Sequence, residues 1–353
     1  MNKNTIVMDV RSKIKLSQTK PTIYYACRLP ISAGGELVNF QHVATLRKLG
    51  WRAVVLLDEG SQVVMPSRPF SVPMVQHGAA LQLSAHDVVV LPEVTPLSSW
   101  ERLKPQCRLV MHNQNPFYTF RSFASVQAMD AFGLFGSLCC SHFTREVLQR
   151  WGSQADWQVV RPFVLPVFTQ AGQQSSVVRK RQIAFMPRKR PVEAQLLKSM
   201  FVSLYPALVD VPWVEIHNMG RAQVAQVLAE SQVFASLSHF EGLGLPPLEA
   251  MAAGCAVVGF TGHGGAEYAT PENGRWVAEG DLEAFVHALA ADVQADATVL
   301  QARRAAGAET AARFDMAQFE VDLNAAWQHV LGDEAPLYRL PQMVDESEAM
   351  DVA

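Results

Sequence analysis

Cysteine is scarce in this chain, and its distribution argues against a metal centre built on thiolates. The five cysteines, Cys27, Cys107, Cys139, Cys140 and Cys255, are odd in number, include one adjacent pair and form no C-x-x-C pair. Structural zinc sites draw on cysteines at that short spacing. Several of these cysteines lie inside apolar runs, so we interpret them as reduced core residues in a reducing compartment.

Strong positive charge and long apolar runs are also lacking. The chain carries 30 Lys and Arg against 33 Asp and Glu, for a formal net charge of -3, whereas nucleic-acid-binding domains are typically strongly basic. No stretch approaches the roughly 20 apolar residues of a membrane-spanning helix. Residues 1–20 lack the unbroken apolar segment of a secretory signal. These absences predict a cytoplasmic protein without a nucleic-acid partner.

Both ends of the chain are expected to be tails. Residues 1–20 are basic, and we interpret them as a flexible N-terminal tail. Peripheral contact of this tail with the inner face of a membrane is an alternative interpretation. Residues 331–353 contain the run Asp345-Glu346-Ser347-Glu348 and are expected to form an acidic C-terminal tail.

Two series of short apolar runs alternate with helical patterns. A chain of 353 residues with 49% hydrophobic side chains is long enough to bury two cores. The runs are continuous and rich in β-branched residues, which is typical of strands buried on both faces of a parallel sheet; they lie at 22–27, 53–57, 88–91, 108–111 and 138–140, and at 183–185, 213–216, 233–237 and 256–260. The polar stretch 170–181 separates the two series.

This pattern predicts an α/β fold with two Rossmann-like, doubly wound domains that face each other across a cleft. The N-terminal domain is expected over 21–168, a linker over 169–180 and the C-terminal domain over 181–330. Ligands bind such sheets outside the carboxyl ends of the strands, so the cleft is the expected site.

The segment from Ser238 to Gly254, SHFEGLGLPPLEAMAAG, has the composition of a ligand-binding turn that opens a helix. Its glycines permit close approach of the backbone to a ligand, and free N–H groups at a helix start suit anionic or hydroxyl-rich groups. Glu241 and Glu249 are suited to accept hydrogen bonds from sugar or ribose hydroxyls. The alternative is that Glu249 only complements the helix dipole and Glu241 is a solvated loop residue.

This segment closely resembles the signature of the family 4 (group 1) retaining glycosyltransferases, which have the GT-B fold. It matches the form S-x-x-E-G-x-G-L-P-x-L-E-A-M-A-x-G and includes the E-x7-E pair. The resemblance covers about residues 181–330 and, more weakly, 21–165. It implies that Glu241 contacts the donor sugar and Glu249 the nucleotide ribose. The backbone of Gly242, Leu243, Gly244 and Leu245 would bind sugar hydroxyls and the diphosphate.

The resemblance extends to three further features outside this segment and departs from the family at one position. The Gly34-Gly35 turn resembles a glycine loop that faces the diphosphate across the cleft. Arg188 matches an arginine that neutralises the leaving diphosphate. The family's lysine is missing at its usual spacing, and Lys189 and Arg190 follow directly, so which of them replaces it stays open. His112 lies where the family places a histidine near the reacting sugar. The alternative for the basic residues 188–190 is a solvated basic loop. The alternative for His112 is a structural histidine.

By resemblance, the chain moves a sugar from a nucleoside-diphosphate sugar to a hydroxyl of a carbohydrate or glycolipid acceptor, with retention, in polysaccharide or glycolipid assembly. The chain contains no Asp-x-Asp triplet, the metal-holding motif of the other common glycosyltransferase fold, so neither a metal nor another cofactor is expected. Loops such as 61–80 and the aromatics Phe117, Tyr118 and Phe120 are candidates for the acceptor side, with a core role as the alternative for the aromatics.

Other functions stay open at this point. A nicotinamide dehydrogenase would need G-x-G-x-x-G after its first strand, which the chain lacks. A nucleotide-sugar epimerase or hydrolase would consume donor without an acceptor. A non-catalytic nucleotide-sugar-binding homologue or partner subunit is the main alternative, and the irregular basic cluster is its best support.

Overall fold

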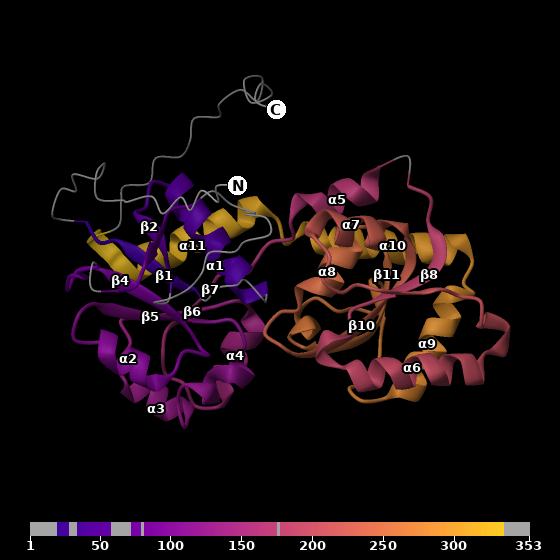
Figure 1. Ribbon diagram of the computed structural model, residues 1–353, viewed down its shortest axis with the longest axis horizontal. Helices are drawn as coiled ribbons and strands as arrows, with labels where there is room; N and C mark the ends of the chain where they lie inside the picture. The colour runs from indigo at the N-terminus through magenta and orange to yellow at the C-terminus, as the bar shows by residue number, and fades with distance from the viewer. Residues whose placement is uncertain (1–19, 28–33, 58–71, 79–80, 175–176, 335–353) are drawn as a thin grey trace, which may run out of the picture.

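The computed structural model describes residues 20–27, 34–57, 72–78, 81–174 and 177–334. These residues form two α/β domains that lie beside each other (Figure 1), as predicted. Among the described residues, no helix combines the length and the apolar character needed to cross a membrane.

The N-terminal domain is built on a seven-stranded parallel sheet with the order β3-β2-β1-β4-β5-β6-β7. Its strands are β1 (Ile23–Cys27), β2 (Ala53–Leu57), β3 (Met74–Gln76), β4 (Val88–Pro92), β5 (Arg108–Asn113), β6 (Gly136–Cys139) and β7 (Trp157–Val159). Ile23 pairs with Ala53 on one side and Val88 on the other. The strand order therefore reverses between β1 and β4, the position at which doubly wound sheets open a crevice for ligands.

Helices cover both faces of this sheet. They are α1 (Gly34–Lys48), α2 (Leu97–Leu103), α3 (Val126–Ala131), α4 (His142–Arg150) and the short 3-10 helix η2 (Pro116–Arg121). The side-chain hydroxyl of Ser141 caps α4 by accepting a 2.9 Å hydrogen bond from the backbone N–H of Thr144, the arrangement expected of serine at this position.

The C-terminal domain has a five-stranded parallel sheet with the order β12-β11-β10-β8-β9. Its strands are β8 (Lys180–Phe185), β9 (Trp213–Glu215), β10 (Ser231–Glu241), β11 (Ala256–His263) and β12 (Gly274–Trp276). The surrounding helices are α5 (Pro166–Gln173), α6 (Pro191–Leu204), α7 (Arg221–Glu230), α8 (Leu245–Ala252), α9 (Leu282–Val293) and α10 (Ala297–Ala312), with the 3-10 turns η3 (Pro187–Lys189), η4 (Pro206–Leu208) and η5 (Gly264–Glu267).

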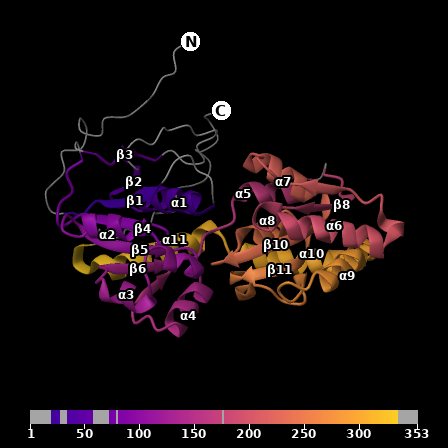
Figure 2. The same ribbon diagram turned by 60° about the horizontal axis from the view of Figure 1, so that its bottom comes forward.

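The last long helix, α11 (Met316–Leu331), falls, except for Leu331, within the range 181–330 expected for the C-terminal domain, but it packs on the N-terminal domain. Phe319, Leu323 and Trp327 lie in the same hydrophobic core as β1 and α1, and the helix lies in the N-terminal lobe in both ribbon views (Figures 1 and 2). The indole N–H of Trp327 donates a 3.1 Å hydrogen bond to the Tyr25 hydroxyl. The helix α11, which follows the C-terminal domain in the sequence, is therefore part of the N-terminal domain.

The segment 169–180, expected to be a linker, begins inside a helix, because residues 169–173 belong to α5. Phe168 and Ala171 of this helix are buried in one core with Val224 and Leu248 of α7 and α8. The crossing between domains thus comes before α5, near Leu165. Of the two expected tails, residues 1–19 and 335–353 lie outside the described residues, whereas Leu331 ends α11 and Glu334, in η6 (Gly332–Glu334), ion-pairs with Arg108 at 2.8 Å.

Candidate active site

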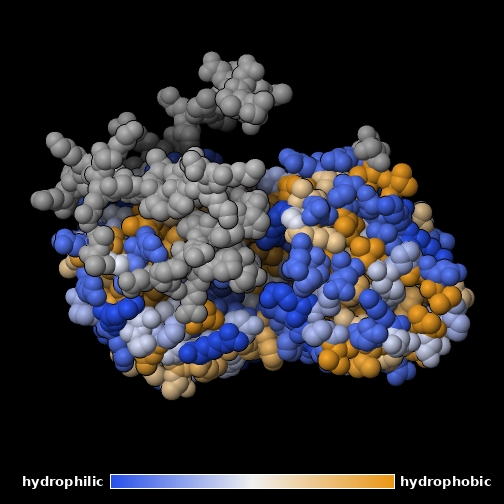
Figure 3. Space-filling model, in the orientation of Figure 1, coloured by the Kyte–Doolittle hydropathy of each residue, from blue (hydrophilic) through white to orange (hydrophobic). Residues whose placement is uncertain are grey.

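A cavity of about 580 Å³ lies between the two domains and is lined by both. It lies outside the carboxyl ends of β1, β4 and β5 in one sheet and of β8 and β10 in the other. The space-filling view shows two lobes that meet at a narrower waist, beside which hydrophilic side chains gather (Figure 3). The predicted cleft site therefore has a physical counterpart in the fold.

The turn between β10 and α8 forms the C-terminal wall of the cavity. Glu241 ends β10, and residues 242 to 246 line the cavity up to the first turn of α8. Gly244 has φ 86°, a left-handed backbone conformation that favours glycine, and this turn places the proline-led N-terminus of α8 at the cleft. Pro246 and Pro247 carry no N–H, so an anionic ligand at this wall would be bound by the backbone N–H groups of residues 242–245.

Glu241 forms an ion pair across this wall. Its Oε1 lies 2.8 Å from Nζ of Lys189, and its side chain is 20% exposed. Burial raises the pKa of Glu241, and the nearby Lys189 and Arg188 oppose that rise. The predicted donor-contacting carboxylate is therefore in the cleft with a cation at its side.

The three basic residues after β8 have separate roles. Arg188 is exposed and lines the cavity together with Lys189. Arg190 is 4% exposed, donates from Nε to the backbone carbonyl of Ser238 at 3.2 Å, and pairs with Glu193 and Glu279. Arg190 thus holds the end of β10, whereas Lys189 lies at the cavity beside Arg188.

Gly242 packs tightly against the N-terminal domain. A Cβ atom at this position would lie 2.1 Å from the backbone carbonyl oxygen of Gln114 and 2.8 Å from Sγ of Cys140. The Gly242 carbonyl accepts hydrogen bonds from the hydroxyls of Ser141 (2.5 Å) and Thr144 (3.3 Å). That carbonyl is committed to the N-terminal domain, so a donor would contact the rest of this loop.

Glu249, the second glutamate of the pair, lies in α8 beyond the residues that line the cavity. It is 5% exposed, and its Oε1 lies 2.7 Å from Nη1 of Arg221. Burial raises the pKa of Glu249, and the ion pair with Arg221 counters the rise. Its ribose role stays a prediction, and it requires the Arg221 pair to share or release the carboxylate.

The glycine turn of the N-terminal domain faces this wall. Gly34 and Gly35 begin α1 and line the cavity. The side-chain amide of Gln114 donates to the Gly35 carbonyl and to Oδ1 of Asn39, both at 3.1 Å. A Cβ atom at Gly35 would lie 3.2 Å from Oε1 of Gln114, so the turn and this side chain pack tightly.

His112 does not line the cleft, contrary to the prediction. It is fully buried in β5, where its Nδ1 lies 3.0 Å from Oδ1 of Asn39 and its ring centroid lies 4.5 Å from that of His42. Burial lowers its pKa to about 3. The reason is strand length: β5 continues to Asn113, so His112 packs within the sheet, and Gln114 is the first residue beyond it.

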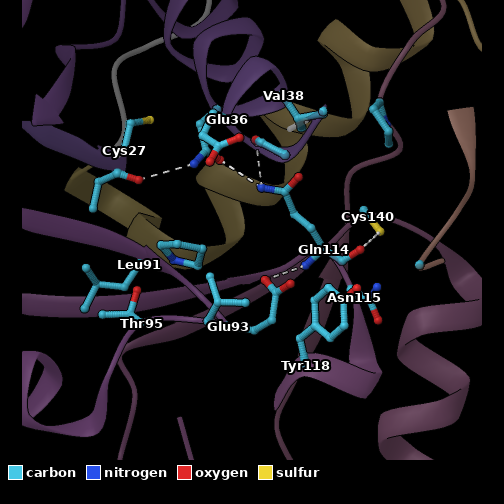
Figure 4. Close-up of a pocket in the computed structure, with 18 of the residues that line it drawn as sticks. Cys27, Glu36, Val38, Leu91, Glu93, Thr95, Gln114, Asn115, Tyr118 and Cys140 are labelled. Carbon is cyan, nitrogen blue, oxygen red and sulfur yellow. Dashed lines mark hydrogen bonds between the residues drawn. The ribbon is translucent and has the colours of Figure 1, made fainter. Parts of the chain in front are cut away.

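Three polar residues that the sequence did not single out line the cavity: Glu93, Gln114 and Asn115 (Figure 4). Glu93 follows β4 directly and is 4% exposed. Its Oε2 accepts a 3.0 Å hydrogen bond from the backbone N–H of Gln114. The pKa of Glu93 is raised to about 7, because burial raises it more than that hydrogen bond and the charge of Arg121 lower it. The available signal was a carboxylate two residues after the apolar run at 88–91, behind Pro92.

The candidate acceptor aromatics separate in the structure. Tyr118 lines the cavity, while Phe117 contacts Phe240 and His263 of the other domain at centroid distances of 4.9 and 5.2 Å. Phe120 is 49% exposed and packs on Trp151. Of the loop 61–80, residues 72–78 are described, and among these His77 lines the cavity.

The part of the chain that the structure describes contains no group of three or more His, Cys, Asp or Glu side chains arranged to hold a metal ion. The expectation of metal-independent chemistry is not tested by this observation.

Comparison with known proteins places these residues in a family context. The family model described as "Glycosyl transferases group 1" matches residues 204–293, which include Glu241 and Glu249. An "Alpha-1,6-glucosyltransferase" of Actinobacillus pleuropneumoniae serotype 7 (strain AP76) is 36% identical over 259 residues, which is 71% of this chain and 77% of that protein.

Two solved structures have the same fold at low sequence identity. HepE (Alr3699) of Anabaena in complex with UDP aligns with a TM-score of 0.65 at 14% identity, over 87% of this chain and 100% of that one. Sucrose-phosphate synthase of Thermosynechococcus elongatus aligns with a TM-score of 0.64 at 14% identity, over 88% and 99%. Both alignments span the two domains, so the GT-B architecture extends through the whole described chain.

Proposed function

The chain belongs to the group 1 glycosyltransferases, and we propose that it transfers a glucosyl group from UDP-glucose to a hydroxyl of a carbohydrate or glycolipid acceptor. The glucosyl group is suggested by the name of the relative that is 36% identical. The uridine nucleotide is suggested by a structural neighbour that was solved with UDP. A role in polysaccharide or glycolipid assembly follows from that acceptor class.

One observation carries the proposal: a single cavity brings together Lys189, Arg188, the N-terminus of α8 and the glycine turn at the start of α1. Two helix N-termini and two cationic side chains attract a diphosphate from both domains. The negative charge that develops on the leaving group is then stabilised by groups already in place.

In the proposed reaction, the bond between the glucosyl C1 and the β-phosphate oxygen breaks, and a bond forms between C1 and the acceptor oxygen. The acceptor proton passes to the β-phosphate oxygen, so UDP leaves in protonated form and no protein nucleophile is consumed. Glu241 holds the donor sugar by accepting hydrogen bonds from its hydroxyls, and Lys189 opposes the rise in the pKa of Glu241 that burial causes.

We further propose that the anomeric configuration is retained and that no metal is needed. UDP-glucose carries an α-linked glucose, and an α-linked product, as in the relative's name, requires net retention. Arg188 and Lys189 would supply the positive charge that a divalent ion supplies in metal-dependent transferases.

Calorimetry with UDP and UDP-glucose, with and without EDTA, tests binding and its metal dependence, and NMR of the product tests retention. Binding that survives EDTA, with UDP released on addition of an acceptor, supports the proposal. A second candidate, a non-catalytic nucleotide-sugar-binding homologue, draws on the ion pairs that engage Glu241 and Glu249. It predicts binding of UDP-glucose without transfer or hydrolysis. Absence of binding would contradict both candidates.

A further inference from the structure

The N-terminal half of the cleft contains a buried carboxyl group that the proposed chemistry does not use. Glu93 follows β4, next to the switch point between β1 and β4, and lines the cavity although only 4% of its surface is exposed (Figure 4). A buried ionisable side chain at the carboxyl ends of parallel strands is costly to the fold, and such groups cluster at functional sites.

The position of this carboxyl group is fixed from several sides. Its Oε2 accepts the 3.0 Å hydrogen bond from the backbone N–H of Gln114. The hydroxyl of Ser122 donates to the backbone carbonyls of both Glu93 and Thr95. The Ser122 contacts fix the backbone at Glu93, and the carboxyl group cannot turn away without breaking its bond to Gln114, which is the preorganisation expected of a group that binds substrate.

The same contact places Glu93 next to the proposed donor loop. The peptide N–H of Gln114 binds Glu93, while the carbonyl of Gln114 lies against Gly242 of the opposite domain. One residue thus separates the carboxyl group from the β10–α8 turn. A group held here can reach a sugar bound on that turn.

The charge distribution assigns the two halves of the cavity to different ligands. Arg188 and Lys189 lie on the C-terminal wall, where the diphosphate is attracted. Glu93 carries a carboxyl oxygen on the N-terminal wall that can accept a hydrogen bond from a hydroxyl. The remaining lining of this half mixes apolar, hydroxyl and charged groups, which suits the apolar face and the hydroxyls of a sugar ring; it includes Leu56, Leu91, Thr95, Tyr118, Glu36 and Arg102.

Resting on the proposed function, we propose that Glu93 binds the acceptor by accepting a hydrogen bond from the hydroxyl that attacks the donor, in a subsite for a neutral hexoside. Glu93 orients the acceptor oxygen toward the glucosyl C1, and the proton still passes to the leaving phosphate. The residue acts on the acceptor and not on the donor.

The test measures UDP release from UDP-glucose with methyl α-glucoside as acceptor, for the wild type, Glu93→Gln, Glu93→Asp and Glu101→Gln. Glu101 is an exposed glutamate of α2 that does not line the cavity, and its variant serves as the matched control. At pH 8.5, where the wild-type carboxyl group is ionised, we expect the KM of Glu93→Gln for the glucoside to rise at least about 10-fold through the loss of one charge-assisted hydrogen bond, while the Kd for UDP stays at the wild-type value. Glu93→Asp keeps the charge but shortens the reach, and we expect an intermediate KM.

Several results overturn the assignment. One is an unchanged acceptor KM and kcat in Glu93→Gln; another is a parallel loss of UDP affinity, which would place Glu93 on the donor. If the wild type hydrolyses UDP-glucose but the glucoside does not accelerate UDP release, the hexoside subsite is wrong while the proposed function stands. If the wild type does not bind UDP, the proposed function itself fails.

Discussion

Replacing Glu93 by glutamine should also change how stability depends on pH, independently of any substrate. Burial raises the pKa of this carboxyl group from 4.5 to about 7 in the folded protein. Between these two values the folded chain keeps a proton that the unfolded chain has lost. A folded state that binds more protons than the unfolded state loses stability as pH rises. The contribution of Glu93 to the free energy of unfolding of the wild type should therefore fall as the pH rises from about 4.5 to 7.

The magnitude follows from the size of the shift. A rise from 4.5 to about 7 is about 2.5 pH units, and each unit corresponds to about 1.4 kcal/mol, so the full effect is about 3 kcal/mol. Glutamine does not titrate, and its side-chain oxygen can still accept the hydrogen bond from the Gln114 backbone. The Glu93→Gln variant should match the wild type near pH 4.5 and exceed its free energy of unfolding by up to about 3 kcal/mol above pH 7.

Urea unfolding followed by tryptophan fluorescence, at intervals from pH 4.5 to pH 8.5, measures this difference. Glu101→Gln, at an exposed position, should give a difference from the wild type that does not vary with pH. A difference for Glu93→Gln that is equally flat would refute the argument, because it would mean that Glu93 titrates like a solvated glutamate.

Three other substitutions test separate parts of the structure. Trp327→Ala should lower the free energy of unfolding by about 3–5 kcal/mol, measured by urea unfolding, because the fully buried indole anchors α11 to the N-terminal domain. Gly242→Ala should lower kcat/KM at least about 10-fold with unchanged circular dichroism, because its Cβ would lie 2.1 Å from the Gln114 carbonyl oxygen and force the domains apart. Lys189→Met should lower kcat about 100-fold and weaken UDP binding, because the variant leaves both the diphosphate and Glu241 without this cation.

Matched controls separate these effects from general damage. Gly220→Ala places a methyl group where the nearest atom is 3.8 Å away, and Lys180→Met removes an exposed surface cation that pairs with Glu230. Both variants should keep wild-type kcat. Wild-type activity in Gly242→Ala or Lys189→Met would contradict the geometry assigned to the cleft, and a loss under about 1 kcal/mol in Trp327→Ala would contradict the packing of α11.

The strands and the donor loop could be predicted because their signals are local. The run at 88–91 became β4, and the helix expected after the first strand became α1. The glycines and glutamates of 238–254 specify a turn and a helix start through their own backbone preferences, so Glu241 and Leu245 occupy the places that the pattern indicated. In each case, neighbouring residues determine the structure.

The placement of α11 and of His112 could not be predicted because both depend on distant contacts. An amphipathic helix shows which of its faces is buried but not which domain covers that face; the hydrogen bond between Trp327 and Tyr25 joins residues 302 positions apart. The sequence pattern predicts a strand over 108–111, whereas β5 ends at Asn113. Because of this difference of two residues, His112 lies inside the sheet and not at the cleft. Side chains alternate between the faces of a strand, so small errors in strand ends have large consequences for site residues.

The same reasoning explains why Gln114 matters more through its backbone than through its side chain. Its N–H fixes Glu93, its carbonyl lies against Gly242, and its side-chain amide binds the Gly35 turn. Two of these three contacts use main-chain atoms, which every residue except proline supplies, so substitution of the Gln114 side chain should loosen the Gly35 turn and Asn39, which that side chain binds. Gly242 cannot be replaced in the same way, because every other residue has a Cβ atom, which would overlap the Gln114 carbonyl oxygen. The relative position of the donor and acceptor halves of the cleft therefore depends on a backbone contact that only glycine can form.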